Sequence, residues 1–258
     1  MKIALIPPVS LLEFTSKTDM QLMLPHLASI PQYRYTYLMH GKDPHQYLIL
    51  DNGVAEGMRA GADMIMELGD FFLVNEIVLP DVLTNAEKTR LLSNNFLDLA
   101  KTHYRGRILS KPKFMYVLQG TSFNQVIKEA QWGAKQPMVD VFGLPRHLIT
   151  TTMTGSHINF SIRSNLAAKI QEISDKPIHL LGGSPDAPNE LGELEFTNNV
   201  RSHDTSSPFN YAYFNKQLQA DIRCGRPLKY FDKPASSFDE HFVNINVNDL
   251  MRWAGYDI

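Results

Sequence analysis

The feature that most constrains the fold of this chain is a regular alternation of short apolar segments with longer segments of helical period. The short segments are rich in β-branched and aromatic residues, and a polar loop follows each of them. This alternation is typical of β-α-β units, in which helices connect parallel strands. We expect eight strands, at residues 3–6, 35–39, 47–50, 76–79, 114–118, 139–142, 178–181 and 200–202.

Helices are expected between these strands and after the last one, at residues 18–29, 55–68, 85–103, 122–132, 161–173, 189–198, 209–223 and 238–253. Eight parallel strands with helices between them close into a barrel of about 250 residues, which suits the 258 residues of this chain. No internal repeat, low-complexity tract or linker divides the sequence. We therefore predict an α/β fold, a (β/α)8 TIM-type barrel that forms a single domain over residues 1–258.

The charge of the chain is nearly balanced. A net charge of −2 and a pI near 6.5 give the whole molecule no general attraction for a polyanion, so a nucleic-acid site would need a local basic patch. One basic cluster, at residues 101–113, is expected to be solvated surface. A second cluster lies close to the candidate catalytic residues described below. It consists of Arg201, Arg223, Arg226, Lys229 and Lys233.

The number and spacing of the cysteine and histidine residues predict no metal site. Cys224 is the single cysteine, which excludes an internal disulfide and a cysteine-rich zinc cluster, and His40, His45, His147 and His179 lack the spacing of metal ligands. No apolar run approaches the roughly 18 residues of a membrane span. We expect a cytoplasmic protein that needs no metal or cofactor and does not enter a membrane.

Polar residues stand at the carboxyl ends of six predicted strands. They are Asp51 to Gly53, Asp81, Gln119 with Gly120, Gly143, Gly182 with Gly183, and His203 with Asp204. Each of them alone could be a helix cap or a turn residue. Because the carboxyl ends of barrel strands converge on one rim, three carboxylates, one amide and several glycines there predict an active site.

This set of groups suits chemistry at a glycosidic bond. Two carboxylates on either side of a sugar carbon can attack it and manage the proton of the leaving group. A third carboxylate and an amide can read the edge of a purine, because carboxylate oxygens accept from ring N–H groups and amides donate to carbonyls. The period of a strand points His203 away from Asp204, so we expect His203 to pack or support rather than react.

Six short segments, taken in order, resemble the tRNA-guanine transglycosylases and their phage and bacterial relatives that insert 7-deazaguanines into DNA. The resemblance runs from about residue 48 to residue 207, and the segments are ILDNG, VLPD, YVLQGTSFNQV, FGLP, HLLGG and VRSHDTS. It implies that Asp204 is the nucleophile, which forms a covalent intermediate with the sugar, and that Asp51 is a general acid and base.

The same resemblance implies a pocket for the exchanged base. Asp81 would read the base, and Gln119, from the glutamine-glycine motif that includes Gly120, would lie at its carbonyl edge. The backbone amide of Gly143 would contact the same carbonyl. Leu181 and Gly182 would flank the ring.

The sequence also departs from the family. It has too few cysteines for the zinc module of the tRNA enzymes, and Ala55 stands where those enzymes place an aromatic residue that stacks on the base. The spacing from Asp51 to Asp81 is short as well. Phe71, Phe72 or Phe142 could close the pocket instead, although all three are expected in the core. The loss of the zinc module in so compact a chain favours the DNA-modifying branch.

The resulting prediction is a pentosyltransferase that exchanges guanine for a 7-deazaguanine derivative, related to queuosine chemistry, in a bacterium or a phage-infected cell. DNA is the favoured substrate and tRNA the alternative. Phosphate contacts are expected from Arg201, Arg223, Arg226 and Lys229. A DNA or nucleoside glycosylase with the same carboxylates stays open, as do a base-binding subunit without activity, a homodimer and an accessory protein.

Overall fold

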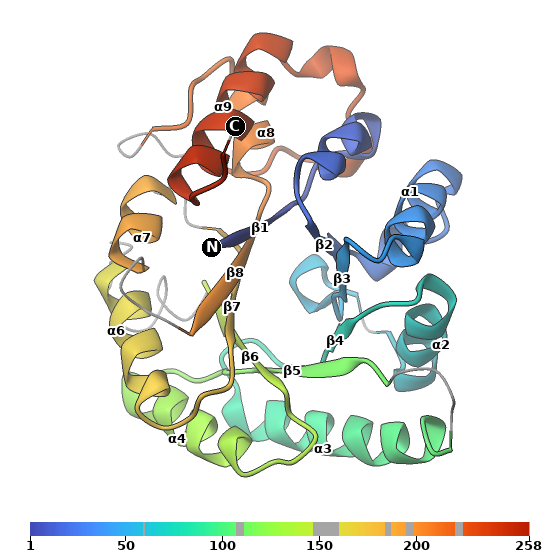
Figure 1. Cartoon of the computed structure of the whole chain (residues 1–258), viewed down its shortest axis with the longest axis vertical. Coiled ribbons are helices and arrows are strands. Elements are labelled where there is room, and N and C mark those ends of the chain that lie inside the picture. Colours follow the sequence, from blue (N-terminus) through green and yellow to red (C-terminus); the bar gives the residue numbers. More distant parts are fainter. Residues whose placement is uncertain are drawn as a thin grey trace.

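The computed structural model describes residues 1–58, 60–106, 111–146, 160–183, 187–194, 199–219 and 224–257. Eight parallel strands form a closed barrel, with each strand paired to its neighbour in the chain and β8 paired to β1 (Figure 1). The strands are β1 (Lys2–Leu5), β2 (Met20–Met23), β3 (Tyr47–Leu50), β4 (Glu76–Val78), β5 (Lys113–Val117), β6 (Val141–Pro145), β7 (Ile178–Leu181) and β8 (Val200–Thr205). The predicted fold class is confirmed.

Helices surround the barrel (Figure 1). They are α1 (Pro31–Lys42), α2 (Ala62–Phe72), α3 (Ala86–His103), α4 (Phe123–Ala134), α6 (Phe160–Gln171), α7 (Ala187–Leu194), α8 (Ser207–Tyr213) and α9 (Glu240–Trp253). Short 3-10 helices are η1 (Val9–Lys17), η2 (Pro25–Leu27), η3 (Val54–Glu56), η4 (Tyr230–Asp232) and η5 (Ala235–Ser237). Among the described residues, no helix is long and apolar enough to cross a membrane.

Side-chain caps fix the start of three helices close to the predicted positions. Asn85, Ser122 and Asp239 each accept a hydrogen bond from a backbone amide in the first turn of α3, α4 and α9, respectively. Such caps satisfy amides that have no partner within the helix. The helix predictions at 55–68 and 209–223 are less accurate, because α2 begins at Ala62 and α8 ends at Tyr213. Residues 195–198 of the helix predicted at 189–198 lie outside the described residues.

The second strand is not where the sequence predicted it. Residues 35–39 belong to α1, and β2 lies within the segment 18–29 that was expected to be a helix. Pro31 occupies the start of α1, and Tyr33 and Tyr37, one turn apart, both face the barrel. The Tyr33 hydroxyl accepts from the Leu24 amide, while the Tyr37 hydroxyl donates to the Leu22 carbonyl, so both tyrosines join α1 to β2.

The amino end of the barrel holds a buried ion pair. Arg201, near the start of β8, donates to both carboxylate oxygens of Glu76, at 2.6 and 2.7 Å, and Tyr47 donates to the same carboxylate at 2.7 Å. Glu76 is fully buried. The arginine was expected to contact phosphates beside Asp204, but its guanidinium lies at the opposite end of the strands from that aspartate.

Candidate active site

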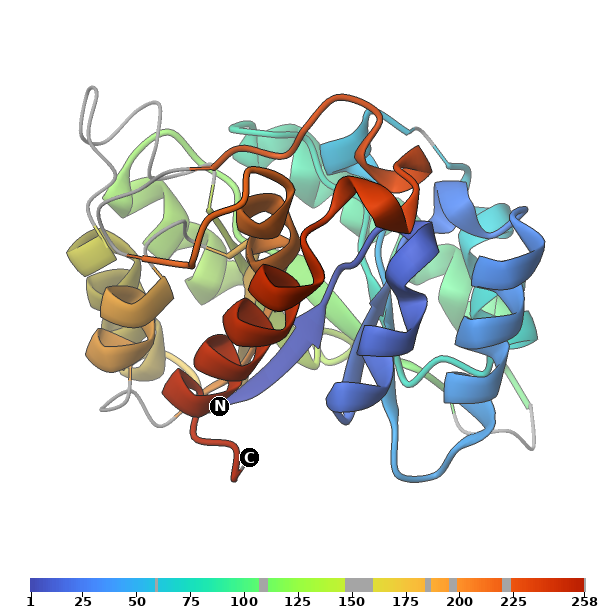
Figure 2. The same cartoon turned by 90° about the horizontal axis from the view of Figure 1, so that it is seen from above.

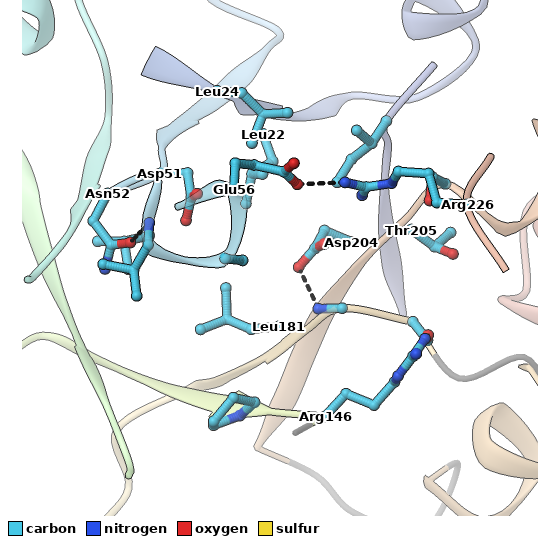
Figure 3. A pocket seen from close by; sticks show the side chains of 18 of the residues that line it. Leu22, Leu24, Asp51, Asn52, Glu56, Arg146, Leu181, Asp204, Thr205 and Arg226 are labelled. Atoms are coloured by element: carbon cyan, nitrogen blue, oxygen red, sulfur yellow. Dashed lines mark hydrogen bonds and ion pairs between the residues drawn. The ribbon is translucent and has the colours of Figure 1, made fainter. Parts of the chain in front are cut away.

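A cavity of about 520 Å³ opens at the carboxyl ends of the strands (Figure 3). Its size is typical of small-molecule sites. The apolar part of its wall contains Ile6, Leu22, Leu24, Val78, Val117 and Leu181, and the polar part contains Asp51, Asn52, Asp81, Gln119, Arg146, Gly182, Asp204 and Arg226. The fold therefore brings together the three aspartates and the glutamine that the sequence selected.

Asp204 is held from one side by two donors. Its Oδ1 atom accepts from His179 Nε2 at 3.1 Å and from the Gly182 amide at 2.9 Å, and among the described residues no donor contacts Oδ2. Burial raises the pKa of Asp204, but the hydrogen bond and charge of His179, with the Gly182 amide, outweigh burial and bring the pKa below its ordinary value. An ionised carboxylate with one free oxygen is suited to nucleophilic attack.

His179 is a site residue that sequence analysis missed. It is fully buried in β7, and its Nδ1 atom lies 2.7 Å from the Ser202 hydroxyl. Nε2 faces Asp204 and Nδ1 faces the Ser202 hydroxyl, so the two contacts fix the orientation of the ring. The strand period offered a partial signal, because His179 alternates with Leu181, and both therefore face the barrel interior.

Asp51 lies on the wall opposite Asp204, and its pKa is shifted in the opposite direction. Its side chain is turned toward the cavity that it shares with Asp204 (Figure 3). Burial raises the pKa of Asp51 to about 7; the Gly53 amide, which donates to Oδ2 at 3.0 Å, opposes this rise, and the charges of Asp204 and Asp81 reinforce it. A carboxyl group with a pKa near 7 can both give and take a proton.

Asp81 belongs to a network of amides at the bottom of the cavity. Asn52 donates to Oδ1 at 2.8 Å, and Gln119 donates to Oδ2 at 2.5 Å. Burial raises the pKa of Asp81 against these hydrogen bonds. Each oxygen of Asp81 thus has a donor within the protein. The Gln119 carbonyl also has a protein partner, because it accepts from the Thr84 amide at 2.9 Å.

The turn after β7 is held in place by hydrogen bonds from a helix outside the barrel. Arg163 of α6 is fully buried and forms a double hydrogen bond with Glu190 of α7, at 2.6 and 2.7 Å. The same guanidinium donates to the Gly182 carbonyl at 3.0 Å. Gly182 has a φ of 74°, in the left-handed region that favours glycine. The Gly182 amide that donates to Asp204 belongs to the preceding peptide, whose Leu181 carbonyl accepts from the same guanidinium at 3.4 Å, so Arg163 holds both peptides of the turn.

Two predicted glycines do not line the cavity. Gly143 lies inside β6, and a Cβ atom there would come within 2.7 Å of Leu181 and 2.9 Å of Met115. Its carbonyl accepts from Leu118, so the residue serves sheet pairing and close packing. Gly120 lies against Gln125 at the start of α4. Neither position supports the expected contact with a base.

The four basic candidates take different positions. Arg226 lines the cavity and pairs with Glu56, as Figure 3 shows. In Figure 2 residues 224–229, drawn in orange-red, cross the side of the barrel away from both termini. Lys229 is exposed in the same segment but does not line the cavity. Arg223 lies outside the described residues, and Arg201 is at the other end of the barrel.

Other residues named from the sequence take structural positions. His203 is fully buried and faces away from Asp204, beside Gly183, as predicted. Phe72 and Phe142 are core residues, and Phe71 is partly exposed on α2. None of the three aromatic side chains lines the cavity. Within the described part of the chain, no cluster of histidine, cysteine, aspartate and glutamate is arranged to hold a metal ion.

No protein-family model and no curated protein is detectably similar to this sequence. Among solved structures, RipC from Yersinia pestis is 12% identical, with 80% of this chain and 88% of that chain covered and a TM-score of 0.45. Tryptophan synthase from M. tuberculosis is 9% identical (83% and 85% covered, TM-score 0.48). The YdjI aldolase from Escherichia coli K12 is 10% identical (86% and 88% covered, TM-score 0.46). An assignment of function therefore depends on the cavity.

Proposed function

We propose that this protein is a pentosyltransferase that exchanges guanine for a 7-deazaguanine derivative in a nucleic acid, with DNA preferred over tRNA. The observation that carries the proposal is the pair of aspartates with opposite pKa shifts in one cavity. Burial raises the pKa of Asp51 to about 7, while His179 and Gly182 keep that of Asp204 low. Glycosidic exchange needs one carboxylate as a nucleophile and one carboxyl group as a proton donor.

The reaction proceeds in two displacements. Asp204 Oδ2 attacks the sugar C1′ atom, the bond from C1′ to the guanine nitrogen breaks, and Asp51 gives its proton to the departing base. The incoming 7-deazaguanine then gives its ring proton to Asp51 and attacks C1′, which releases Asp204. Each displacement inverts C1′, so the configuration of the sugar is retained.

The network of Asp81, Asn52 and Gln119 suits the recognition of a purine edge. Each carboxylate oxygen of Asp81 has one protein donor and retains a second lone pair for a ring N–H. Because the network holds these groups before a ligand arrives, little ordering is needed on binding. The target base must leave its stack to reach this depth, at a cost of a few kcal/mol.

The decisive experiment traps the intermediate. Wild-type protein is mixed with guanine-labelled duplex DNA or tRNA and a 7-deazaguanine, denatured, and examined for a protein–nucleic acid adduct and for released guanine. Asp204→Asn is nearly isosteric and a much poorer nucleophile, so it should bind nucleic acid normally but give no adduct, no release and no incorporation. Asp98→Asn, at a carboxylate that is 72% exposed on α3, is the matched control and should behave as wild type.

The other outcomes separate the alternatives. Guanine release without incorporation would make the protein a glycosylase that passes the sugar to water through the same carboxylates. Exchange in tRNA with DNA inert would reverse the preferred substrate. Normal exchange by Asp204→Asn would overturn the proposal as a whole, since the nucleophile would then lie elsewhere.

A further inference from the structure

Arg146 is a basic residue of the cavity that the reaction above does not use. It follows β6 directly and lines the cavity together with Asp204 and Gly182. Its Nη1 atom donates to the Gly183 carbonyl at 2.7 Å, which fixes the guanidinium beside the turn after β7. The other donor nitrogens of this guanidinium form no hydrogen bond to the residues that the structure describes.

The charge of Arg146 lacks the compensation that its neighbours have. Arg163 is paired with Glu190, and Arg226 is paired with Glu56. Across the described ranges of the chain, no carboxylate forms an ion pair with Arg146. Burial lowers the pKa of Arg146, and the positive charges of Arg163 and Arg226 lower it further, against the carboxylates of Glu190 and Asp204. An anion bound here would offset both the burial of this positive charge and its repulsion by Arg163 and Arg226.

The cavity is also polarised from one wall to the other. Figure 3 shows Asp51 and Asn52 on one side, and Asp204, Arg146 and Arg226 on the other. Asp81 lies with the first group, because it is hydrogen-bonded to Asn52. A nucleotide has the matching polarity, with N–H donors on its base and negative charge on its phosphate, and Asp204 lies between the two ends where a sugar would be.

We propose that Arg146 binds a phosphate ester of the nucleotide that occupies the cavity, and thereby sets the orientation in which C1′ faces Asp204. The inference rests on the proposed function for the identity of the base, but the phosphate contact itself can be measured without catalysis. A planar guanidinium with free N–H groups suits two phosphate oxygens at once. Ser206 and Ser207 line the same cavity and offer hydroxyl donors to the remaining oxygen atoms.

Calorimetric binding of four probes tests the proposal: deoxyguanosine, its 5′-monophosphate, its 3′-monophosphate, and a short single-stranded oligodeoxynucleotide with one guanine. Wild type should bind at least one phosphorylated probe about 10- to 100-fold more tightly than the nucleoside, as expected for a charged hydrogen bond. If only the monophosphates bind more tightly than the nucleoside, the ligand is a free nucleotide. If the oligonucleotide also binds more tightly, the ligand is the phosphodiester of a nucleic acid.

Arg146→Gln should abolish this gain and leave the affinity for deoxyguanosine unchanged. Arg146→Lys keeps the charge without the planar fork, so it should keep part of the gain, and it serves as the test if the glutamine variant does not fold. The matched control is Arg252→Gln, which removes an arginine that is 70% exposed on α9 and should leave the gain intact.

The inference is overturned if wild type binds the nucleoside and all phosphorylated probes equally, or if both Arg146 variants retain the full gain. Failure of the proposed function gives a different pattern. A gain that depends on Arg146 without any base exchange would keep the phosphate contact and reject the transglycosylase. Base exchange without a higher affinity for the phosphorylated probes would keep the transglycosylase and reject the phosphate contact.

Discussion

Asp51 and Asp204 show how neighbouring atoms give two identical side chains different chemistry. Both are buried in the same cavity, but Asp204 accepts from a histidine and a backbone amide, whereas Asp51 accepts from the Gly53 amide and faces two other carboxylates. Hydrogen bonds to the charged form lower a pKa, and burial and like charges raise it for an acid. The pair can therefore hold one negative charge and one proton near neutral pH.

This difference predicts the pH dependence of guanine release. Asp51 must be protonated to give its proton, so single-turnover release should fall about tenfold per pH unit once the pH rises above about 7, the pKa of Asp51. Asp204 must be ionised, so the acidic limb should lie below the ordinary range of an aspartate. Asp51→Asn should slow release by roughly 10²- to 10⁴-fold and remove the limb near pH 7. A limb that persists unchanged in this variant would assign that ionisation to another group.

At the scale of single elements, the sequence predicts strands well where β-branched or aromatic residues lie between clear turns. β2 (Met20–Met23, MQLM) lacks these marks, and all four of its residues are buried, so it has no alternation of exposed and buried positions. Residues 35–39 contain two of the tyrosines of α1, which favour a strand by composition. Packing decides for the helix, because one helical turn between Tyr33 and Tyr37 brings both hydroxyls to the backbone of residues 22 to 24, at the end of β2.

The candidate site is predictable where it depends on strand ends and unpredictable where it depends on register. Asp51, Asp81, Gln119 and Asp204 follow from the rule that barrel chemistry gathers at the carboxyl ends. The role of His179 requires the pairing of β7 with β8, which includes an irregularity between residues 178 and 179. No local pattern specifies that irregularity.

Gly143 provides a test of packing in one strand. Gly143→Ala would place a Cβ atom 2.7 Å from Leu181 and 2.9 Å from Met115, and should lower the free energy of unfolding by about 1–3 kcal/mol through overpacking. The control is Gly192→Ala in α7, where a Cβ atom meets nothing within 4 Å and should raise stability by about 0.5–1 kcal/mol. Urea denaturation measures both. Equal effects of the two substitutions would contradict the close packing of β6.

At the scale of the whole molecule, the barrel separates its two polar clusters. The aspartates lie at the carboxyl ends of the strands, and the ion pair of Arg201 with Glu76 lies at the amino ends, where a barrel holds groups that stabilise the fold. The apolar layers between them include Ile49 and Met115, both fully buried. Stability and activity should therefore respond to different substitutions.

Arg201→Met tests this separation, because it leaves the fully buried Glu76 without its cation. The free energy of unfolding at pH 7, measured by urea denaturation, should fall by about 3–5 kcal/mol, and the double variant Arg201→Met/Glu76→Leu should recover a large part of the loss. Base exchange by the folded fraction, measured well below the melting temperature, should be unchanged, and so should its dependence on salt. A weaker dependence on salt would instead restore Arg201 as a phosphate contact, and a loss of exchange in fully folded protein would show that the two ends of the barrel are coupled.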